Sequence, residues 1–154
     1  MSDDEQPTLA DVEKVAYRLL ARRDHAHGEL VRKLRQRDFP DDLIEQVVDD
    51  CVDSGYVDDR RFACEQGRML VRKCWGPHQI RKRLRARGVD DTVIDDAIDQ
   101  LGEEFDFKDQ AKQRLESKFG DPAELDDRDQ QRAYRHLIHR GYSADLIRRL
   151  LFDC

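Results

Sequence analysis

The stretch Glu29–Ile44 reads Glu-Leu-Val-Arg-Lys-Leu-Arg-Gln-Arg-Asp-Phe-Pro-Asp-Asp-Leu-Ile, and fifty positions later Gln79–Ile94 reads Gln-Ile-Arg-Lys-Arg-Leu-Arg-Ala-Arg-Gly-Val-Asp-Asp-Thr-Val-Ile. A third copy lies near the C-terminus, with Ala133, Leu137, Arg140, Gly141 and Tyr142 at the equivalent places. The same register in three copies is typical of a repeat protein, in which each copy is one supersecondary unit.

Each copy predicts two successive helices. In the first helix, apolar residues recur four positions apart and so share one face: Leu30/Leu34, Ile80/Leu84 and Ala133/Leu137. The second helix carries two adjacent pairs at the same spacing: Leu43/Ile44 with Val47/Val48, Val93/Ile94 with Ala97/Ile98, and Leu146/Ile147 with Leu150/Leu151.

The residues between the two helices support these boundaries. Gly88 and Gly141 suit the left-handed conformation that ends many helices, whereas Asp38 fits it less well. Pro40 is followed by two acidic residues, which is typical of a first helical turn. Ser143 is predicted to be an N-cap residue.

A preceding helix completes each three-helix module. Its apolar residues are Ala16, Leu19 and Leu20 in the first copy, Met69 and Leu70 in the second, and Ala111 and Leu115 in the third. The sequence therefore predicts an all-α tandem array of three three-helix modules. We expect residues 1–10 to form a flexible acidic tail and the modules to cover residues 11–59, 60–106 and 107–154, the third with a loop inserted at 119–125. Because modules of about 50 residues bury little surface alone, we expect them to stack into an elongated, curved array.

Composition restricts the class of protein. Of 154 residues, 38% are hydrophobic and 40% are charged, a balance that favours amphipathic helices over strands. The formal net charge of -6 argues against a protein that coats nucleic acid or an anionic membrane by bulk charge.

The chain also lacks the patterns of export and membrane insertion. No window approaches the roughly 18 apolar residues of a membrane span, and the acidic N-terminus contains no apolar segment of a secretory signal. The four cysteines have no CxxC spacing, which predicts reduced thiols in the cytoplasm. We expect a cytoplasmic monomer without a membrane partner.

Charge is segregated along the repeat. Residues 72–87 contain seven basic and no acidic residues, and residues 88–109 are strongly acidic. Stacked modules would align equivalent basic positions into one stripe, which can follow a polymer. The predicted partner-binding residues of this stripe are Arg32, Lys33, Arg35, Arg37, Arg72, Lys73, Arg81, Lys82, Arg85 and Arg87. In the alternative interpretation, these residues merely face acidic helices or water in weak exposed ion pairs.

No catalytic or cofactor-binding pattern accompanies the charges. The chain has no Gly-rich phosphate loop. The pairs His25/His27 and His136/His139 lack the further ligands of a tetrahedral metal site. We therefore predict no cofactor, no metal and no enzymatic activity.

Four motifs occur in order along the chain, namely Arg22–Leu30, Gly55–Ala63, Gly76–Ile80 and His139–Tyr142. Together they resemble the RecX family, whose members regulate the bacterial recombinase RecA, and the resemblance runs from about Ala16 to the C-terminus. One departure is Ala26, where the family usually has a serine that caps the next helix. Its absence should cost about 1 kcal/mol of local stability.

The resemblance implies a protein that binds in the groove of the RecA–DNA filament. It would inhibit RecA's ATP hydrolysis, strand exchange and co-protease activity, and so act in DNA repair and the SOS response. Capping of filament ends and coating of the groove both stay open, and direct contact with filament DNA is compatible with either. The motif residues Tyr56, Asp58, Asp59, Phe62, Trp75 and Pro77 are assigned to module junctions.

Two other functions fit the residues. The first is a helical-repeat protein that binds nucleic acid directly, without RecA, and whose affinity falls steeply with salt. The second is a scaffold that joins two proteins through its basic and acidic faces.

Overall fold

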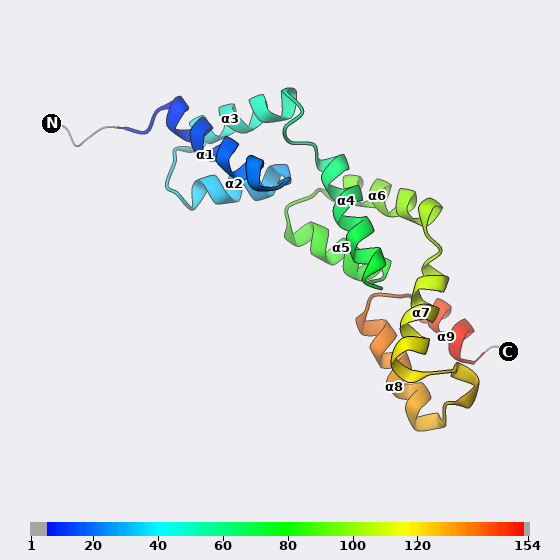
Figure 1. The fold of residues 1–154 in the computed structure, drawn as a ribbon. Helices are drawn as coiled ribbons and strands as arrows, with labels where there is room; N and C mark the ends of the chain where they lie inside the picture. The colour runs from blue at the N-terminus through cyan, green and yellow to red at the C-terminus, as the bar shows by residue number, and fades with distance from the viewer. Residues whose placement is uncertain (1–5, 153–154) are drawn as a thin grey trace. The chain divides into compact units, whose positions relative to one another are not determined.

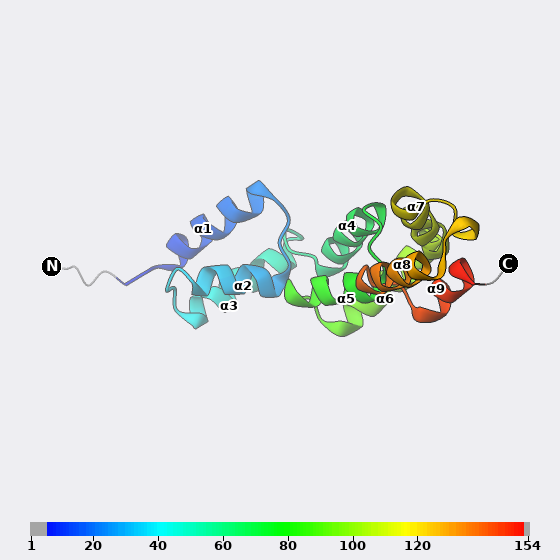
Figure 2. The same ribbon diagram turned by 90° about the horizontal axis from the view of Figure 1, so that it is seen from below.

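The computed structural model describes residues 6–152, which form helices and no strand (Figures 1 and 2). The predicted all-α class is therefore confirmed. The elements are α1 (Leu9–Arg22), α2 (His27–Arg35), α3 (Asp41–Asp53), α4 (Asp59–Arg72), α5 (Pro77–Ala86), α6 (Asp91–Glu104), α7 (Phe107–Phe119), the 3-10 turn η1 (Pro122–Glu124), α8 (Asp127–His139) and α9 (Ala144–Leu151). Residues 1–10 were predicted to form a tail, but α1 begins within this range, at Leu9. Residues 1–5 of the predicted tail lie outside the described part of the chain.

The chain divides into two compact units. The first takes in the described residues up to Ala63 together with Arg87–Val89, and the second takes in Cys64–Ala86 and the described residues from Asp90 onward. The chain passes from the first unit to the second within α4. The boundaries of the three modules stay a prediction.

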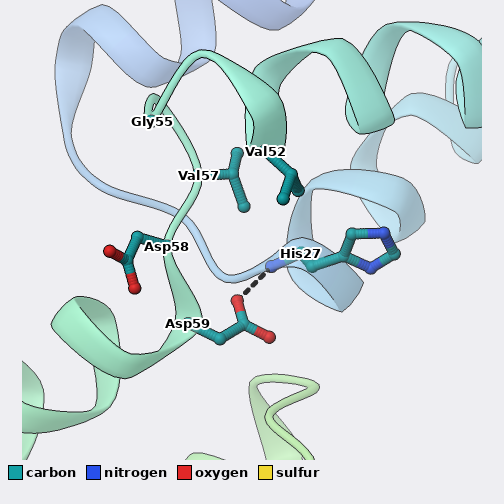
Figure 3. A pocket seen from close by; sticks show the side chains of 6 residues that line it. All are labelled: His27, Val52, Gly55, Val57, Asp58 and Asp59. Carbon is teal, nitrogen blue, oxygen red and sulfur yellow. Dashed lines mark hydrogen bonds between the residues drawn. The ribbon is translucent and has the colours of Figure 1, made fainter.

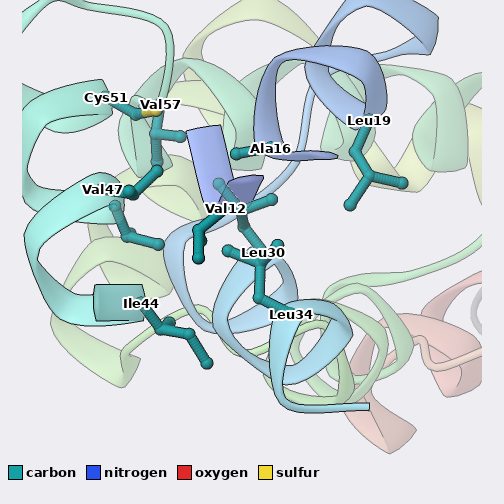
Figure 4. Close-up of a cluster of buried hydrophobic side chains, with 10 residues drawn as sticks. Val12, Ala16, Leu19, Leu30, Leu34, Ile44, Val47, Cys51 and Val57 are labelled. Carbon is teal, nitrogen blue, oxygen red and sulfur yellow. The ribbon is translucent and has the colours of Figure 1, made fainter. Parts of the chain in front are cut away.

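The core of the first unit lies among α1, α2 and α3 (Figure 4). The helical spacing predicted these contacts correctly, since both members of the α2 pair Leu30/Leu34 are fully buried. The other buried residues of this cluster are Val12, Ala16, Leu19, Ile44, Val47, Val48, Cys51 and Val57. Leu20 and Leu43 are only partly buried and pack against it.

Buried residues of the second unit follow the same spacing. Ile80 and Leu84 of α5 are buried, as are Ile94, Ala97 and Leu101 of α6. A further cluster joins α7, α8 and α9 and contains Ala111, Leu115, Ala133, Leu137, Tyr142, Ile147 and Leu151. The placement of Met69 was wrong: its side chain is 41% exposed, and Val71 is buried instead.

The ends of the helices agree with most of the predicted signals. Gly88 and Gly141 have φ values of +86° and +97°, and Ser143 caps α9 by accepting a hydrogen bond from the Leu146 N–H. Asp38 also adopts a positive φ, +64°, so an aspartate ends α2 where glycine ends the other copies. Pro40 is the N-cap residue of α3 and lies just outside its first turn. The inserted loop of the third copy contains the turn η1.

Candidate functional site: the basic second helices

The predicted basic residues lie in both units. Arg32, Lys33 and Arg35 belong to α2, Arg37 follows it, and Arg87 is also part of the first unit. The second unit contains Arg72 at the end of α4, Lys73 just beyond it, and the α5 residues Arg81, Lys82 and Arg85. Continuity of the stripe from one unit to the other stays a prediction.

Three of these arginines form ion pairs with the acidic helix that follows them. Arg35 Nε lies 3.0 Å from Asp41 Oδ1, and Arg85 repeats the pair with Asp91 at 3.0 Å. Arg81 pairs with Asp95. Exposed pairs of this kind contribute about 0–1 kcal/mol. They are therefore weak enough to open when a partner offers a competing anion.

Arg87 has a structural position. Its Nε lies 2.8 Å from Oε2 of Glu29, a carboxylate that is nearly fully buried, and its guanidinium lies 5.3 Å from the centre of the Phe62 ring. Arg23 makes two further hydrogen bonds to Glu29, at 2.9 and 3.0 Å. Burial disfavours the charged carboxylate, but the hydrogen bonds from Arg23 and Arg87 outweigh it and lower the pKa of Glu29 to about 2. Arg87 therefore neutralises an interior charge.

Lys33 interacts with a buried histidine. Its Nζ lies 3.1 Å from Nε2 of His25, whose Nδ1 lies 3.0 Å from the carbonyl oxygen of Arg23. A neutral imidazole satisfies both contacts, because Nδ1–H donates to the carbonyl and Nε2 accepts from Lys33. Burial lowers the pKa of His25 and favours this neutral form.

Other predicted residues keep an uncompensated charge. Arg37, Lys73 and Lys82 are exposed, and their side chains form no ion pair with any residue of the described range 6–152. Arg72 is also exposed and lies 5.7 Å from the centre of the Phe105 ring. Arg37, Lys73 and Lys82 can therefore meet an external anion without breaking an internal ion pair.

The sequence predicted a junction role for Trp75 in the second unit but not its contacts with two arginines. The indole of Trp75 lies between two guanidinium groups, with Arg83 at 3.9 Å and Arg140 at 3.7 Å from its centre. Arg140 Nε donates to the carbonyl of Cys74 at 3.0 Å, and the Gly76 N–H donates to the Arg140 carbonyl at 2.7 Å. Trp75 therefore joins α4 and α5 to the turn after α8, as its assignment to a junction requires. Arg140 occupies the same place in the third copy as Arg37 and Arg87 in the first two, and this repetition is the sequence feature that could have indicated the contact.

The acidic motif residues have capping roles. Asp59 and Asp58 line a small pocket with His27, Val52, Gly55 and Val57 (Figure 3). Asp59 Oδ1 accepts a hydrogen bond from the His27 N–H at 2.7 Å, and Asp58 Oδ1 accepts one from the Arg61 N–H at 3.1 Å. Phe62 is buried, but Tyr56 is 56% exposed and contacts Tyr17 instead of lying in a junction. The pocket is thus built from helix ends, and its carboxylates are already engaged.

Within residues 6–152, no three metal-ligating side chains come together. None of the helices in this range has the length and apolar character needed to cross a bilayer.

Comparison with known families matches three consecutive segments of the chain. Residues 14–51 match the first three-helix domain of RecX, residues 58–98 the second, and residues 106–151 the third. The regulatory protein RecX of Pseudomonas fluorescens strain Pf-5 is 37% identical over 144 residues, which cover 94% of this chain and 92% of that protein. RecX of Vibrio campbellii is 36% identical over 141 residues, or 92% and 89% of the two chains.

Solved structures share the fold. The crystal structure of RecX from Lactobacillus salivarius has a TM-score of 0.82 at 21% identity and covers 92% of this chain and 93% of that one. A second crystal structure of a regulatory protein RecX has a TM-score of 0.75 at 24% identity, over 95% and 74% of the two chains. The prediction of three tandem three-helix domains is thereby confirmed.

Proposed function

This chain belongs to the RecX family of regulatory proteins, and from that premise we propose that it binds the RecA–DNA filament and inhibits RecA. The inhibited activities are ATP hydrolysis, strand exchange and co-protease function. The protein acts by binding, as a cytoplasmic monomer without a cofactor or catalytic step of its own. The observation that carries the proposal is the match of all three RecX domains in order along the chain.

The charges of the second helices support the choice of surface. The equivalent pairs Arg35–Asp41 and Arg85–Asp91 are weak, and Arg37, Lys73 and Lys82 have no internal counter-ion within the described residues. A RecA–DNA filament presents phosphates and acidic side chains that these cations would neutralise. Arg87 contributes least to such a contact because Glu29 already holds it.

The test is a titration of DNA-dependent ATP hydrolysis by preformed RecA filaments, beside binding to bare DNA at the same salt. We expect inhibition at concentrations well below those that bind bare DNA. Inhibition that begins only once bare DNA is saturated would overturn the proposal.

Charge-reversal variants test whether the basic stripe is the surface that contacts the filament. Arg37→Glu, Lys73→Glu and Lys82→Glu, combined, reverse three charges without breaking an internal ion pair, and this variant should lose inhibition. The combination Lys14→Glu, Lys108→Glu and Arg128→Glu changes the charge equally at exposed positions outside the stripe and should inhibit normally. Equal inhibition by the two variants would contradict the stripe.

Direct nucleic-acid binding is the second candidate, favoured by the same uncompensated cations. It predicts equal affinity for bare DNA and filaments. It also predicts a logarithmic salt slope of about one unit for each phosphate contact.

A further inference from the structure

A second group of basic side chains lies outside the predicted stripe, where α7 and α8 pack side by side (Figure 1). We name Arg114, Lys118, His136 and His139 the His136 cluster. Arg114 Nε lies 3.0 Å from His136 Nε2, and Lys118 Nζ lies 3.3 Å from Nδ1 of the same ring. Phe119 contacts the ring edge, with 5.8 Å between ring centres. Both ring nitrogens therefore face a cationic side chain.

The donors and acceptors of this cluster do not balance. Arginine and protonated lysine side chains only donate hydrogen bonds, and a neutral imidazole has one acceptor nitrogen and one N–H. When Nε2 accepts from Arg114, Nδ1 carries the hydrogen, and the Lys118 ammonium faces a second donor. His25 shows the balanced case, because its second nitrogen meets a carbonyl oxygen. The His136 cluster lacks an acceptor.

The cluster also lacks a negative charge. Among residues 6–152, no carboxylate pairs with Arg114, Lys118 or His139. Neighbours on the same two helices do have such partners: Lys112 lies 3.9 Å from Glu116, and Arg132 lies 3.2 Å from Asp129. Burial, followed by the charges of Lys118, Arg114, Arg140 and His139, lowers the pKa of His136 to about 4. The positive charge of the cluster is therefore left without an internal counter-ion in this part of the chain.

We propose that the His136 cluster binds a phosphate group of a nucleic-acid backbone. A phosphodiester supplies the missing acceptor and the missing charge together, and its oxygens can accept from Arg114 and Lys118 at once. Lys118 and His139 are exposed while Arg114 and His136 are half-buried, so the site is open on one side. An open site suits a group carried on a polymer. The inference rests on the proposed function only for the identity of that polymer.

Nuclear magnetic resonance of the histidine side chains tests binding in the full chain without RecA. A ten-residue oligothymidylate should shift the His136 resonances at pH 7 and raise the pKa of His136, because the phosphate offsets the neighbouring cations. The resonances of buried His25 should stay unchanged, and His136→Gln identifies the signal. No shift, or an equal shift with a ten-residue oligoglutamate, would overturn the phosphate assignment, the latter in favour of an acidic protein.

Matched variants test how much the His136 cluster contributes to the affinity for oligothymidylate. The combined change Arg114→Gln and Lys118→Gln should weaken oligothymidylate binding about tenfold and reduce its logarithmic salt slope by about 0.7, the value for one phosphate of a single strand. Lys108→Gln with Lys112→Gln removes the same charge from α7 and should change neither value. Equal effects of the two variants would refute the site. Inhibition of RecA is measured separately, so failure of the site and failure of the proposed function are distinguishable.

Discussion

The side chain of Asp59, the first residue of α4, accepts a hydrogen bond of 2.7 Å from the backbone N–H of His27, the first residue of α2. The N-cap residue of α2 is Ala26, which makes no side-chain hydrogen bond. An aspartate thirty-two residues away along the chain therefore satisfies the first N–H group of α2, whereas a serine at position 26 would serve the N–H of Gly28 or Glu29. This distant cap offsets part of the stability that Ala26 does not supply.

Asp59→Ala should lower the free energy of unfolding by about 1–2 kcal/mol, because it leaves the α2 N-terminus without a side-chain acceptor. Ala26→Ser should stabilise the parent chain and the Asp59→Ala variant by similar amounts, because its hydroxyl would accept from a different N–H group of the same helix end. Chemical denaturation of the four proteins measures the coupling. A gain confined to the Asp59→Ala background would show instead that the two side chains compete for one N–H group.

The buried carboxylate of Glu29 should contribute more than any exposed pair. Glu29→Gln leaves Arg23 and Arg87 without their counter-charge, and we expect a loss of about 2–3 kcal/mol, since both arginines are partly solvated. Glu45→Gln, an exposed change on α3, should cost little. The folded pKa of about 2 lies below the value of 4.5 for a free glutamate, so the contribution is present above pH 4.5 and disappears as the pH falls to 2. A difference between the variants that persists undiminished at pH 2 would contradict this origin.

Gly141 should tolerate no side chain. It has a φ of +97°, and an added Cβ would lie 2.5 Å from the backbone nitrogen of Gln79. Gly55, with a φ of +79°, has nothing within 4 Å of that position, so Gly55→Ala reports backbone strain alone, about 1 kcal/mol. Gly141→Ala adds a steric clash and should cost about 3 kcal/mol or more by thermal or chemical unfolding. Similar costs at the two positions would show that the Gly141 approach is not tightly packed.

The sequence allowed the helices to be predicted because their pattern is local. A spacing of four identifies a buried face such as Leu30/Leu34 without knowledge of its neighbours. The error at Met69 came from transferring the register of the first copy. The period within α4 itself, with Phe62, Ala63 and Val71 buried, places Met69 on the outer face.

The site was predicted less completely, because charge pairing depends on distant residues. Nothing near Glu29 in the sequence indicates that Arg87 would neutralise it, since the two are 58 residues apart. Within the basic run Arg81–Arg87, Arg87 therefore pairs with an interior carboxylate, whereas its neighbours in the sequence include exposed cations. The His136 cluster was likewise hidden, because its members come from two helices and appear in the sequence only as ordinary basic residues and a histidine pair.

His136 should make the chain less stable in mild acid. Its folded pKa of about 4 lies below the value of about 6.5 in an unfolded chain, so between these values the unfolded chain binds a proton that the folded chain excludes. The titration of His136 therefore leaves the free energy of unfolding unchanged above pH 6.5. As the pH falls to 4, it lowers that free energy progressively, by about 1–2 kcal/mol after allowance for solvent screening.

Comparison with His136→Gln isolates this effect, because the glutamine does not titrate while His25 and the carboxylates are common to both proteins. The stability of the parent relative to the variant should fall between pH 6.5 and 4 in low-salt denaturation experiments. Bound oligothymidylate should reduce the fall, since a phosphate beside Lys118 and Arg114 permits His136 to hold its proton. Parallel stability curves for the two proteins would show that burial and the neighbouring cations do not lower the pKa of His136 on folding.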